Sequence, residues 1–323
     1  MSGEEASAGP MPSRWLVRLE MAAAAGVFLL WSIGQVWRER YWITGLCFFA
    51  PSFLVGIFLA AMAAWSWKQR HDRRLSLAVS ACALVPLIFV ATVENRWRPA
   101  EIQRTDTIRL LHWNVFGGKG GWDRLFDLVR EEAADISVLS EVTLQIDLPA
   151  VASMLGSEYQ SLRVRGIAVF ARGSLELRRE FEIPWGIAGE VVWTGPQGPL
   201  SLLVIDLPSS VRLPRGPLLA RFREILEEVQ PDLVVGDFNT PRRSAGLQQL
   251  PGGYRHAYEA VGSGWSATWP LPLPFWAIDQ CLFSPRIEPV RYTLTSSPLS
   301  DHRCQQFEFR RLPDESEAEA AMP

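Results

Sequence analysis

Residues 234–241 read VVGDFNTP, and they place Asp237 and Asn239 at the end of a short apolar run. An apolar run of this length, bounded by turn-forming residues, predicts a buried β-strand. A rigid strand that ends in a carboxylate and an amide presents both side chains to a cleft. The stretch therefore predicts a polar functional site at the end of a buried strand.

Other strand-like runs also lead into polar side chains. IRLLHWN ends at Asn114, ISVLSE ends at Glu141, AIDQ contains Asp279, and SDH contains Asp301 and His302. Carboxylate oxygens are ligands that suit Mg²⁺ or Mn²⁺. A histidine beside a carboxylate suits proton transfer or charge stabilisation. Together these residue types are the ones that a metal-assisted phosphoester hydrolase requires.

Strand-like runs outnumber helical ones between residues 107 and 312. Only 122–133 and 218–229 have a clear helical spacing of apolar residues. Many strands, few helices and irregular connections predict a layered α/β sandwich. A polar linker at 95–106 precedes this domain, and we expect the acidic tail at 313–323 to be disordered.

Three apolar runs without Asp, Glu, Lys or Arg lie in the N-terminal region, residues 1–94. They cover 21–37, 41–67 and 75–93. A helix that crosses a bilayer needs about 20 apolar residues, so we expect a bundle of three transmembrane helices at about 19–37, 42–66 and 75–93. A signal peptide is the alternative for the first run, but the second run follows at once, without a soluble mature start.

Basic residues in the short loops give the orientation of these spans. Six lie on the N-terminal side of a three-span protein and five on the other side. The six are Arg14, Arg18, Lys68, Arg70, Arg73 and Arg74, and the five are Arg38, Arg40, Arg96, Arg98 and Arg104. The positive-inside rule then places a multi-pass protein in the cell membrane with its C-terminal domain outside, by a margin of one charge.

Charge and cysteine content exclude several classes of protein. Residues 105–323 contain 21 Lys and Arg against 28 Asp and Glu, a net charge of −7, which argues against strong non-specific binding to duplex nucleic acid. The four cysteines include no C-x-x-C pair, which excludes a zinc ribbon or a thioredoxin-type site. Sequence alone leaves open whether Cys281 and Cys304 pair in an exported domain.

The combination of motifs resembles the endonuclease/exonuclease/phosphatase superfamily, whose members have the deoxyribonuclease I-like fold. The resemblance covers about residues 108–309 and follows the order of motifs in the family. It rests on HWNV (112–115), ADISVLSEV (134–142), GIAVFAR (166–172), VVGDFNTP (234–241), TWP (268–270), AIDQ (277–280) and SDH (300–302). It implies a four-layer α/β sandwich as the catalytic domain at 107–312.

The resemblance also implies a metal site. Glu141 would be the main ligand of Mg²⁺ or Mn²⁺, and Asn114 would help to hold the metal or a phosphate oxygen. Asp301 would add to the metal site or to its hydrogen bonds, with a structural turn as the alternative.

The same resemblance assigns the hydrolytic step. Asp237 would orient or deprotonate the attacking water, and Asn239 would hold that water or the phosphate. His302 would contact the scissile phosphate, and Asp279 would hydrogen-bond the His302 ring and set its tautomer.

The chain departs from the family pattern at several positions. Asp206 stands where many members have a histidine, and it would either bind a second metal or repel an anionic substrate. Ala277, Gln280 and Ser140 also differ from the usual residues. Lys119, in a glycine-rich loop that is not a P-loop, is a candidate phosphate contact. The aromatic and proline-rich segment 265–276 is either a rim that meets lipid or substrate, or a stiff connection before Asp279.

These observations favour a membrane-tethered, Mg²⁺-dependent phosphoester hydrolase, which is either a phosphodiesterase or nuclease, or a phosphatase. Nucleic acid and a phospholipid or small phosphoester both remain as substrate classes. The lipid bilayer is the other expected partner, and we expect no defined protein partner. The alternative is a catalytically silent, membrane-anchored binding module that reuses the same fold.

Overall fold

The computed structural model describes residues 14–69, 72–98, 106–210 and 212–312. The predicted tail at 313–323 and most of the predicted linker lie outside these ranges. The chain divides into a helical unit, which ends at Glu94, and an α/β unit, which follows from Asn95. Each unit is described by itself.

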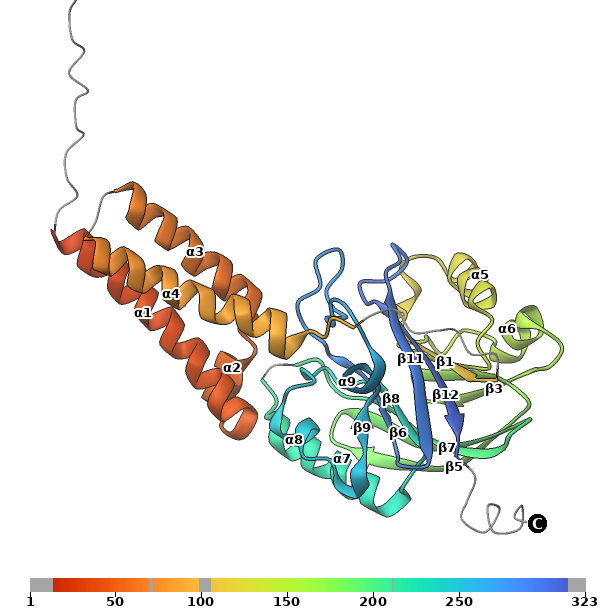
Figure 1. Ribbon diagram of the computed structural model, residues 1–323. Helices are drawn as coiled ribbons and strands as arrows, with labels where there is room; N and C mark the ends of the chain where they lie inside the picture. Colours follow the sequence, from red (N-terminus) through yellow and green to blue (C-terminus); the bar gives the residue numbers. More distant parts are fainter. Residues whose placement is uncertain (1–13, 70–71, 99–105, 211, 313–323) are drawn as a thin grey trace, which may run out of the picture. The chain divides into compact units, whose positions relative to one another are not determined.

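The helical unit contains four α-helices (Figure 1). They are α1 (Arg14–Trp37), α2 (Trp42–Phe48), α3 (Ser52–Lys68) and α4 (Arg73–Phe89), and a π-helical turn at Val90–Glu94 continues α4. A small core that includes Trp31, Leu59 and Val79 packs between the helices. Two of the helices are long and apolar enough to cross a membrane, or three spans result if α2 and α3 count as one.

The second predicted span is not one continuous helix. The axes of α2 and α3 are bent by 68° at the break between Phe48 and Ser52. Pro51 stands at this break in an extended conformation, with ψ of 121°. Proline has no N–H group for a helical hydrogen bond and disfavours the helical conformation of the preceding residue, which accounts for the break.

The α/β unit consists of two six-stranded sheets. In spatial order, the first sheet contains β11 (Ile287–Thr295), β12 (Cys304–Arg311), β1 (Ile108–Asn114), β2 (Ile136–Ser140), β4 (Ile167–Arg172) and β3 (Tyr159–Val164). The second contains β5 (Ser174–Ile183), β6 (Gly186–Gly195), β7 (Gly198–Asp206), β8 (Leu233–Asp237), β10 (Asp279–Phe283) and β9 (Arg255–His256). The pairs β1–β2 and β7–β8 are parallel, and the other strand pairs are antiparallel.

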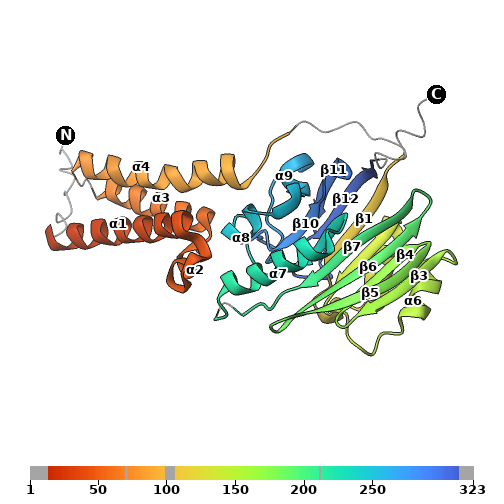
Figure 2. The same cartoon turned by 90° about the horizontal axis from the view of Figure 1, so that it is seen from below.

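Helices cover the outer faces of both sheets (Figure 1). They are α5 (Trp122–Glu132), α6 (Leu148–Leu155), α7 (Arg215–Val229) and α8 (Ala245–Gln248), whereas the short helix α9 (Ala257–Val261) packs against the core between the sheets. Helices α5 and α6 share a core with the first sheet, and α7 and α8 share one with the second. Figure 2 shows α7 in front of the second sheet. The resulting order of helix, sheet, sheet and helix confirms the predicted four-layer sandwich.

The central strands are mostly apolar, and nearly all of their residues are buried, because both of their faces are covered. In β1, Leu110 points into the core between the sheets, whereas Leu111 points into the core beneath α5 and α6. Successive side chains of a strand point to opposite faces, so a strand between two cores has no polar face. Cys281 and Cys304 belong to these two different cores, and both are free thiols.

Candidate active site

The ends of the central strands meet at one edge of the two sheets. In the first sheet, Asn114 at the end of β1 pairs with Ser140 at the end of β2. In the second sheet, Asp206 and Asp237 end the parallel strands β7 and β8, and Asp279 begins β10 opposite Asp237. Since parallel strands bring their carboxyl ends to the same edge, the predicted site residues gather there.

Asn114 connects the two sheets at this edge. Its Nδ2 donates hydrogen bonds to Glu141 Oε1 and to Asp237 Oδ2, both at 3.0 Å. Its Oδ1 accepts a hydrogen bond from the N–H group of Phe116 at 3.0 Å. One amide group therefore holds a carboxylate from each sheet at a fixed position.

Two residues of the site have an unusual backbone conformation. Glu141 has a φ of +61° and Asn239 a φ of +47°, a region that side-chain-bearing residues rarely adopt and that concentrates at functional sites. The exposed Glu141 side chain turns out of the buried strand β2. The Asn239 N–H donates to Asp237 Oδ1 at 2.7 Å, and Asn239 Nδ2 donates to the Leu207 carbonyl at 2.7 Å.

His302 and Asp279 form a buried hydrogen-bonded pair. Nδ1 of His302 lies 2.9 Å from Asp279 Oδ2. Burial acts to lower the pKa of His302, but the Asp279 carboxylate outweighs burial and raises this pKa to about 9. Burial acts to raise the pKa of Asp279, but His302 outweighs it and lowers this pKa. The pair is therefore an imidazolium with a carboxylate, and the Nδ1 proton faces Asp279.

His302 Nε2 points toward Asp237. The distance from Nε2 to Asp237 Oδ2 is 3.9 Å, which is longer than a direct hydrogen bond. Burial, followed by the nearby Asp279 carboxylate, raises the pKa of Asp237 to about 7. The site thus combines a hydrogen-bond donor with a carboxyl group that can accept a proton near neutral pH.

The donor set at this edge fits a divalent cation. Ligand-type atoms of Asp237, Asp279 and His302 lie within 4.8 Å of one another, but the protonated His302 has no free lone pair, so the carboxylates are the groups that can hold a cation. Glu141 and Asp237 offer further oxygens beside Asn114. Burial and the charges of Asp237, Glu141 and Asp279 raise the pKa of Asp206 well above its usual range. Such an excess of carboxylates is what a hard cation neutralises.

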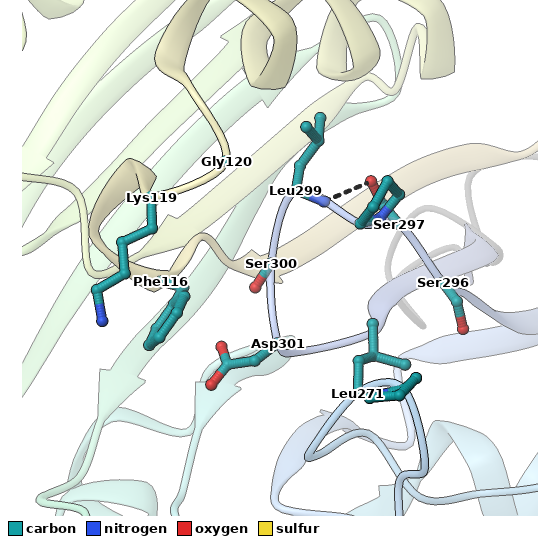
Figure 3. Close-up of a pocket in the computed structure, with 11 residues that line it drawn as sticks. Phe116, Lys119, Gly120, Leu271, Ser296, Ser297, Leu299, Ser300 and Asp301 are labelled. Atoms are coloured by element: carbon teal, nitrogen blue, oxygen red, sulfur yellow. Dashed lines mark hydrogen bonds between the residues drawn. The ribbon is translucent and has the colours of Figure 1, made fainter.

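Asp301 lies at the side of this cluster. Trp269 Nε1 donates to Asp301 Oδ2 at 2.9 Å, and the Asp301 carbonyl accepts from the Leu271 N–H at 2.7 Å. The Asp301 carboxylate lines a pocket of about 580 Å³. Figure 3 shows Phe116 and Lys119 opposite Leu271 across this pocket. The Lys119 ammonium stands 3.5 Å from the centre of the Phe116 ring.

Sequence reasoning missed several residues that support the site. Ser300 Oγ donates to the Asn114 carbonyl at 2.7 Å and accepts from the His302 N–H at 3.0 Å. The Trp269 ring stacks on Trp276 at 5.3 Å between centroids and also contacts Asp301. The SDH and TWP motifs contain Ser300 and Trp269, but the bonds from Ser300 to Asn114 and from Trp269 to Asp301 join segments far apart in the chain.

The two other histidines that the structure describes, His112 and His256, are buried. His112 is fully buried beside the site, and its Nδ1 lies 4.0 Å from Asp279 Oδ1. His256 is also buried, and its Nε2 lies 2.8 Å from the Leu247 carbonyl.

Comparisons with known proteins agree with this geometry. Residues 111–302 match the model of the Endonuclease/Exonuclease/phosphatase family. A protein of that family from Bacteroides thetaiotaomicron is 16% identical, with a TM-score of 0.51, covering 64% of this chain and 98% of its own. A mannosyl-6-phosphatase from the same organism is 15% identical, with a TM-score of 0.50, covering 63% and 99%.

A third structure, of an endonuclease/exonuclease/phosphatase from Bacteroides vulgatus, is 16% identical, with a TM-score of 0.51, and covers 64% of this chain and 100% of its own. No curated protein sequence matches the chain significantly. At these identities the structural likeness establishes the fold alone.

Proposed function

The chain belongs to the endonuclease/exonuclease/phosphatase family, and from this premise we propose that it is a membrane-tethered phosphoester hydrolase that depends on Mg²⁺ or Mn²⁺. One observation carries the proposal. Asn114 joins Glu141 to Asp237 by two hydrogen bonds of 3.0 Å, beside the 2.9 Å pair of Asp279 and His302. A binding module without catalysis has no need for this arrangement of charges.

Glu141 would hold the cation, and Asn114 would keep the Glu141 carboxylate beside that of Asp237. When bound, a divalent cation polarises a phosphoryl oxygen and stabilises the charge that develops on it. Asp301 is the further predicted ligand, and its hydrogen bond to Trp269 supports a fixed position beside the site.

The chain's own groups would act on the water and on the phosphate. The raised pKa of Asp237 suits acceptance of a proton from the attacking water, and Asn239 would hold that water. The protonated His302 would donate from Nε2 to a phosphoryl oxygen. The 3.9 Å between Nε2 and Asp237 Oδ2 leaves room for a reacting oxygen to interact with both groups. Asp279 would keep His302 charged and correctly oriented.

The test is hydrolysis by the full chain in detergent, with bis-p-nitrophenyl phosphate and p-nitrophenyl phosphate as soluble probes. Asp237→Asn and His302→Gln should each reduce turnover by about 10²- to 10⁴-fold, and EDTA should abolish it. His256→Gln and Asp127→Asn are matched controls, because His256 is buried outside the site and Asp127 is exposed on α5. Full turnover in both active-site variants would contradict the assignment.

Metal binding gives a readout that is independent of turnover. Mg²⁺ or Mn²⁺ at about 100 times its dissociation constant should stabilise the protein by about 2.7 kcal/mol, seen as a higher unfolding temperature. Glu141→Gln should remove this shift, and the exposed Asp127→Asn should keep it. No metal-induced shift, together with no turnover of either probe, would favour the catalytically silent binding module.

A further inference from the structure

The most exposed apolar side chains of the α/β unit are on three loops. Within residues 106–312, the exposed fractions of Trp185, Leu144 and Leu273 are 79%, 74% and 72%. The other exposed large apolar side chains in that range, Met154, Leu177 and Leu312, reach 36–42%. Trp97, at the start of the unit and outside this range, is 66% exposed. The first three are the most exposed of residues 106–312, and we call them the apolar rim.

All three rim residues lie at the edge that contains the candidate active site. Leu144 follows Glu141 by three residues in the loop after β2. Trp185 lies in the turn between β5 and β6. Two residues later, Ile187 pairs with Asp206, which ends β7 at the site. Leu273 belongs to the segment 269–276, which is tied to Asp301 by the Leu271 N–H and by Trp269.

The loops of the rim are suited to partial burial in an apolar medium. Full burial of a Leu or Trp side chain contributes about 1.5–3 kcal/mol. Pro184 precedes Trp185, and Pro272 and Pro274 flank Leu273. Proline restricts the backbone, so less conformational entropy is lost when these tips become fixed. Tryptophan also prefers the boundary between water and hydrocarbon.

The pocket beside Asp301 has the same mixed character. Its walls contain Phe116, Leu271, Pro272 and Leu299, and its polar groups include the Lys119 ammonium. Figure 3 shows Asp301 between Phe116 and Leu271. Lys119 is the only lysine in residues 105–323, where the net charge is −7. A pocket with apolar walls, whose charged groups are the Lys119 ammonium and the Asp301 carboxylate, suits an apolar group attached to a phosphoester better than a polyanionic nucleic acid.

We propose that the apolar rim lies on the surface of a lipid bilayer, and that the substrate is a lipid phosphoester whose apolar part enters the pocket beside Asp301. The bilayer is the favoured occupant because this chain contains two or three helices that are long and apolar enough to cross one. The substrate class rests on the proposed function, whereas contact of the rim with lipid does not.

Contact with lipid is tested by spin labels on the full chain in phosphatidylcholine nanodiscs that hold one copy each. Single labels would be introduced by Leu144→Cys, Trp185→Cys and Leu273→Cys, with Cys47→Ser and Cys82→Ser to remove the half-buried thiols. Leu312→Cys is the control. Leu312 follows β12 (Cys304–Arg311), which begins two residues after His302 and leads away from the site. Its eight residues span roughly 26 Å at about 3.3 Å per residue, so Leu312 lies at the opposite edge of the sheet from the site.

Labels on the rim should be accessible to oxygen and protected from a water-soluble nickel chelate, and the label at residue 312 should show the reverse. Equal access of the nickel chelate to all four positions would overturn the proposal. Protection from the nickel chelate only when two copies share a nanodisc would assign the rim to contact between copies. That result would also overturn the proposal.

The substrate class is tested by replacing the rim with Leu144→Ser, Trp185→Ser and Leu273→Ser together. Turnover of phosphatidic acid or phosphatidylglycerol in phosphatidylcholine nanodiscs should fall by about tenfold or more. Turnover of bis-p-nitrophenyl phosphate should stay within about twofold, because no rim side chain belongs to the catalytic cluster. Equal losses on both substrates, or none on the lipid, would reject lipid specificity. Absence of turnover on every substrate in the unmodified chain would instead reject the proposed function.

Discussion

Two buried histidines approach the carboxyl group of Asp279, and the chain keeps one of them protonated and the other neutral. His302 Nδ1 bonds Oδ2 at 2.9 Å, whereas His112 Nδ1 lies 4.0 Å from Oδ1. His112 Nδ1 instead lies 2.7 Å from Gln305 Nε2, and Gln305 Oε1 accepts from the Tyr292 hydroxyl at 2.6 Å. Gln305 thus presents its N–H to His112 Nδ1, which must accept.

A histidine that accepts at Nδ1 is neutral. Burial lowers the pKa of His112 to about 4, although Asp279 acts in the opposite direction. The positive charge is therefore confined to His302, which faces Asp237. Without the hydrogen bond from Gln305, His112 and His302 would compete for the Asp279 carboxylate. The protonation of His302 at Nε2 would then be less strictly determined.

His256, the buried histidine outside the site, allows a prediction of how the free energy of unfolding depends on pH. Burial lowers the pKa of His256 from 6.5 to about 4. Between these values the unfolded chain binds a proton that the folded chain excludes, so stability falls as pH decreases from 6.5 toward 4. The contribution of His256 is at most about 3 kcal/mol, at 1.36 kcal/mol per pKa unit.

The measurement is the unfolding temperature of the full chain in detergent at pH 7, 6 and 5. His256→Gln should flatten the decrease with acidity, whatever its effect at pH 7. Leu247→Val is the control, because it changes a buried neighbour of His256 without adding or removing a titrating group. An unchanged pH dependence in His256→Gln would show that the imidazole is accessible to protons in the folded state.

At the scale of elements, sequence predicted best the strands that are buried on both faces. The expected run at 108–114 is β1, the expected run that leads into Asp237 in 234–241 belongs to β8 (Leu233–Asp237), and the helical run at 122–133 corresponds to α5 (Trp122–Glu132). Edge strands were harder. β5 exposes most of its residues, and β11 contains Pro289 at an irregularity in its pairing. Edge positions tolerate such residues, so an apolar pattern does not mark them.

The same limit applies to the site. The gathering of Asn114, Glu141 and Asp237 was predictable, because each residue follows a central strand whose position is fixed by burial. The bond from Trp269 to Asp301 and the two bonds of Ser300 were not, because they depend on loop paths that no periodicity encodes. The break between α2 and α3 was also missed, although Pro51 was the available signal.

Gly236 offers a test at this scale, because it allows β7 and β8 to lie close together beside Asp237. A Cβ at Gly236 would lie 1.7 Å from the Ile205 carbonyl oxygen, so the backbone would have to move. Gly236→Ala should destabilise the protein by about 1–3 kcal/mol or more and should also reduce turnover, because Asp237 would shift.

The matched control is Gly166→Ala. The nearest atom to its added Cβ is Ile187 Cδ1 at 3.4 Å, which is an ordinary contact with the end of a flexible side chain. Thermal unfolding and hydrolysis of the soluble probe would be measured for both variants. Equal behaviour of the two variants would mean that the close approach of β7 and β8 is not needed at Gly236.

At the scale of the whole molecule, the helices differ from those of a water-soluble bundle. Their outward side chains are large and apolar, with exposed fractions of 60% for Leu29, 49% for Ile57 and 57% for Ile88. A helix in water normally has a polar face opposite its core. Burial of these faces in lipid accounts for the pattern, and it supports the membrane tether as part of the proposed function.

The number of spans decides on which side of the membrane the α/β unit lies. If α2 and α3 together cross once, there are three spans and the unit is on the opposite side from the N-terminus. If the 68° bend makes α2 and α3 a re-entrant loop, there are two spans, and the N-terminus and the α/β unit lie on the same side. For the three-span arrangement that the sequence predicts, six basic residues against five favour the N-terminus inside. A C-terminal alkaline phosphatase fusion in a bacterial host should then be active, and a fluorescent protein fusion dark.

This margin of one charge makes the orientation sensitive to substitution. Arg73→Gln with Arg74→Gln reduces the inner count from six to four, below the five on the other side. Reporter activity of the phosphatase fusion should decrease and fluorescence should rise, because short-loop charges set orientation. Arg109→Gln with Arg172→Gln, in the α/β unit and away from the spans, is the control and should change neither. Bright fluorescence in the unmodified chain would contradict three spans with the N-terminus inside. If a separate label then shows that the N-terminus lies inside, α2 and α3 form a re-entrant loop.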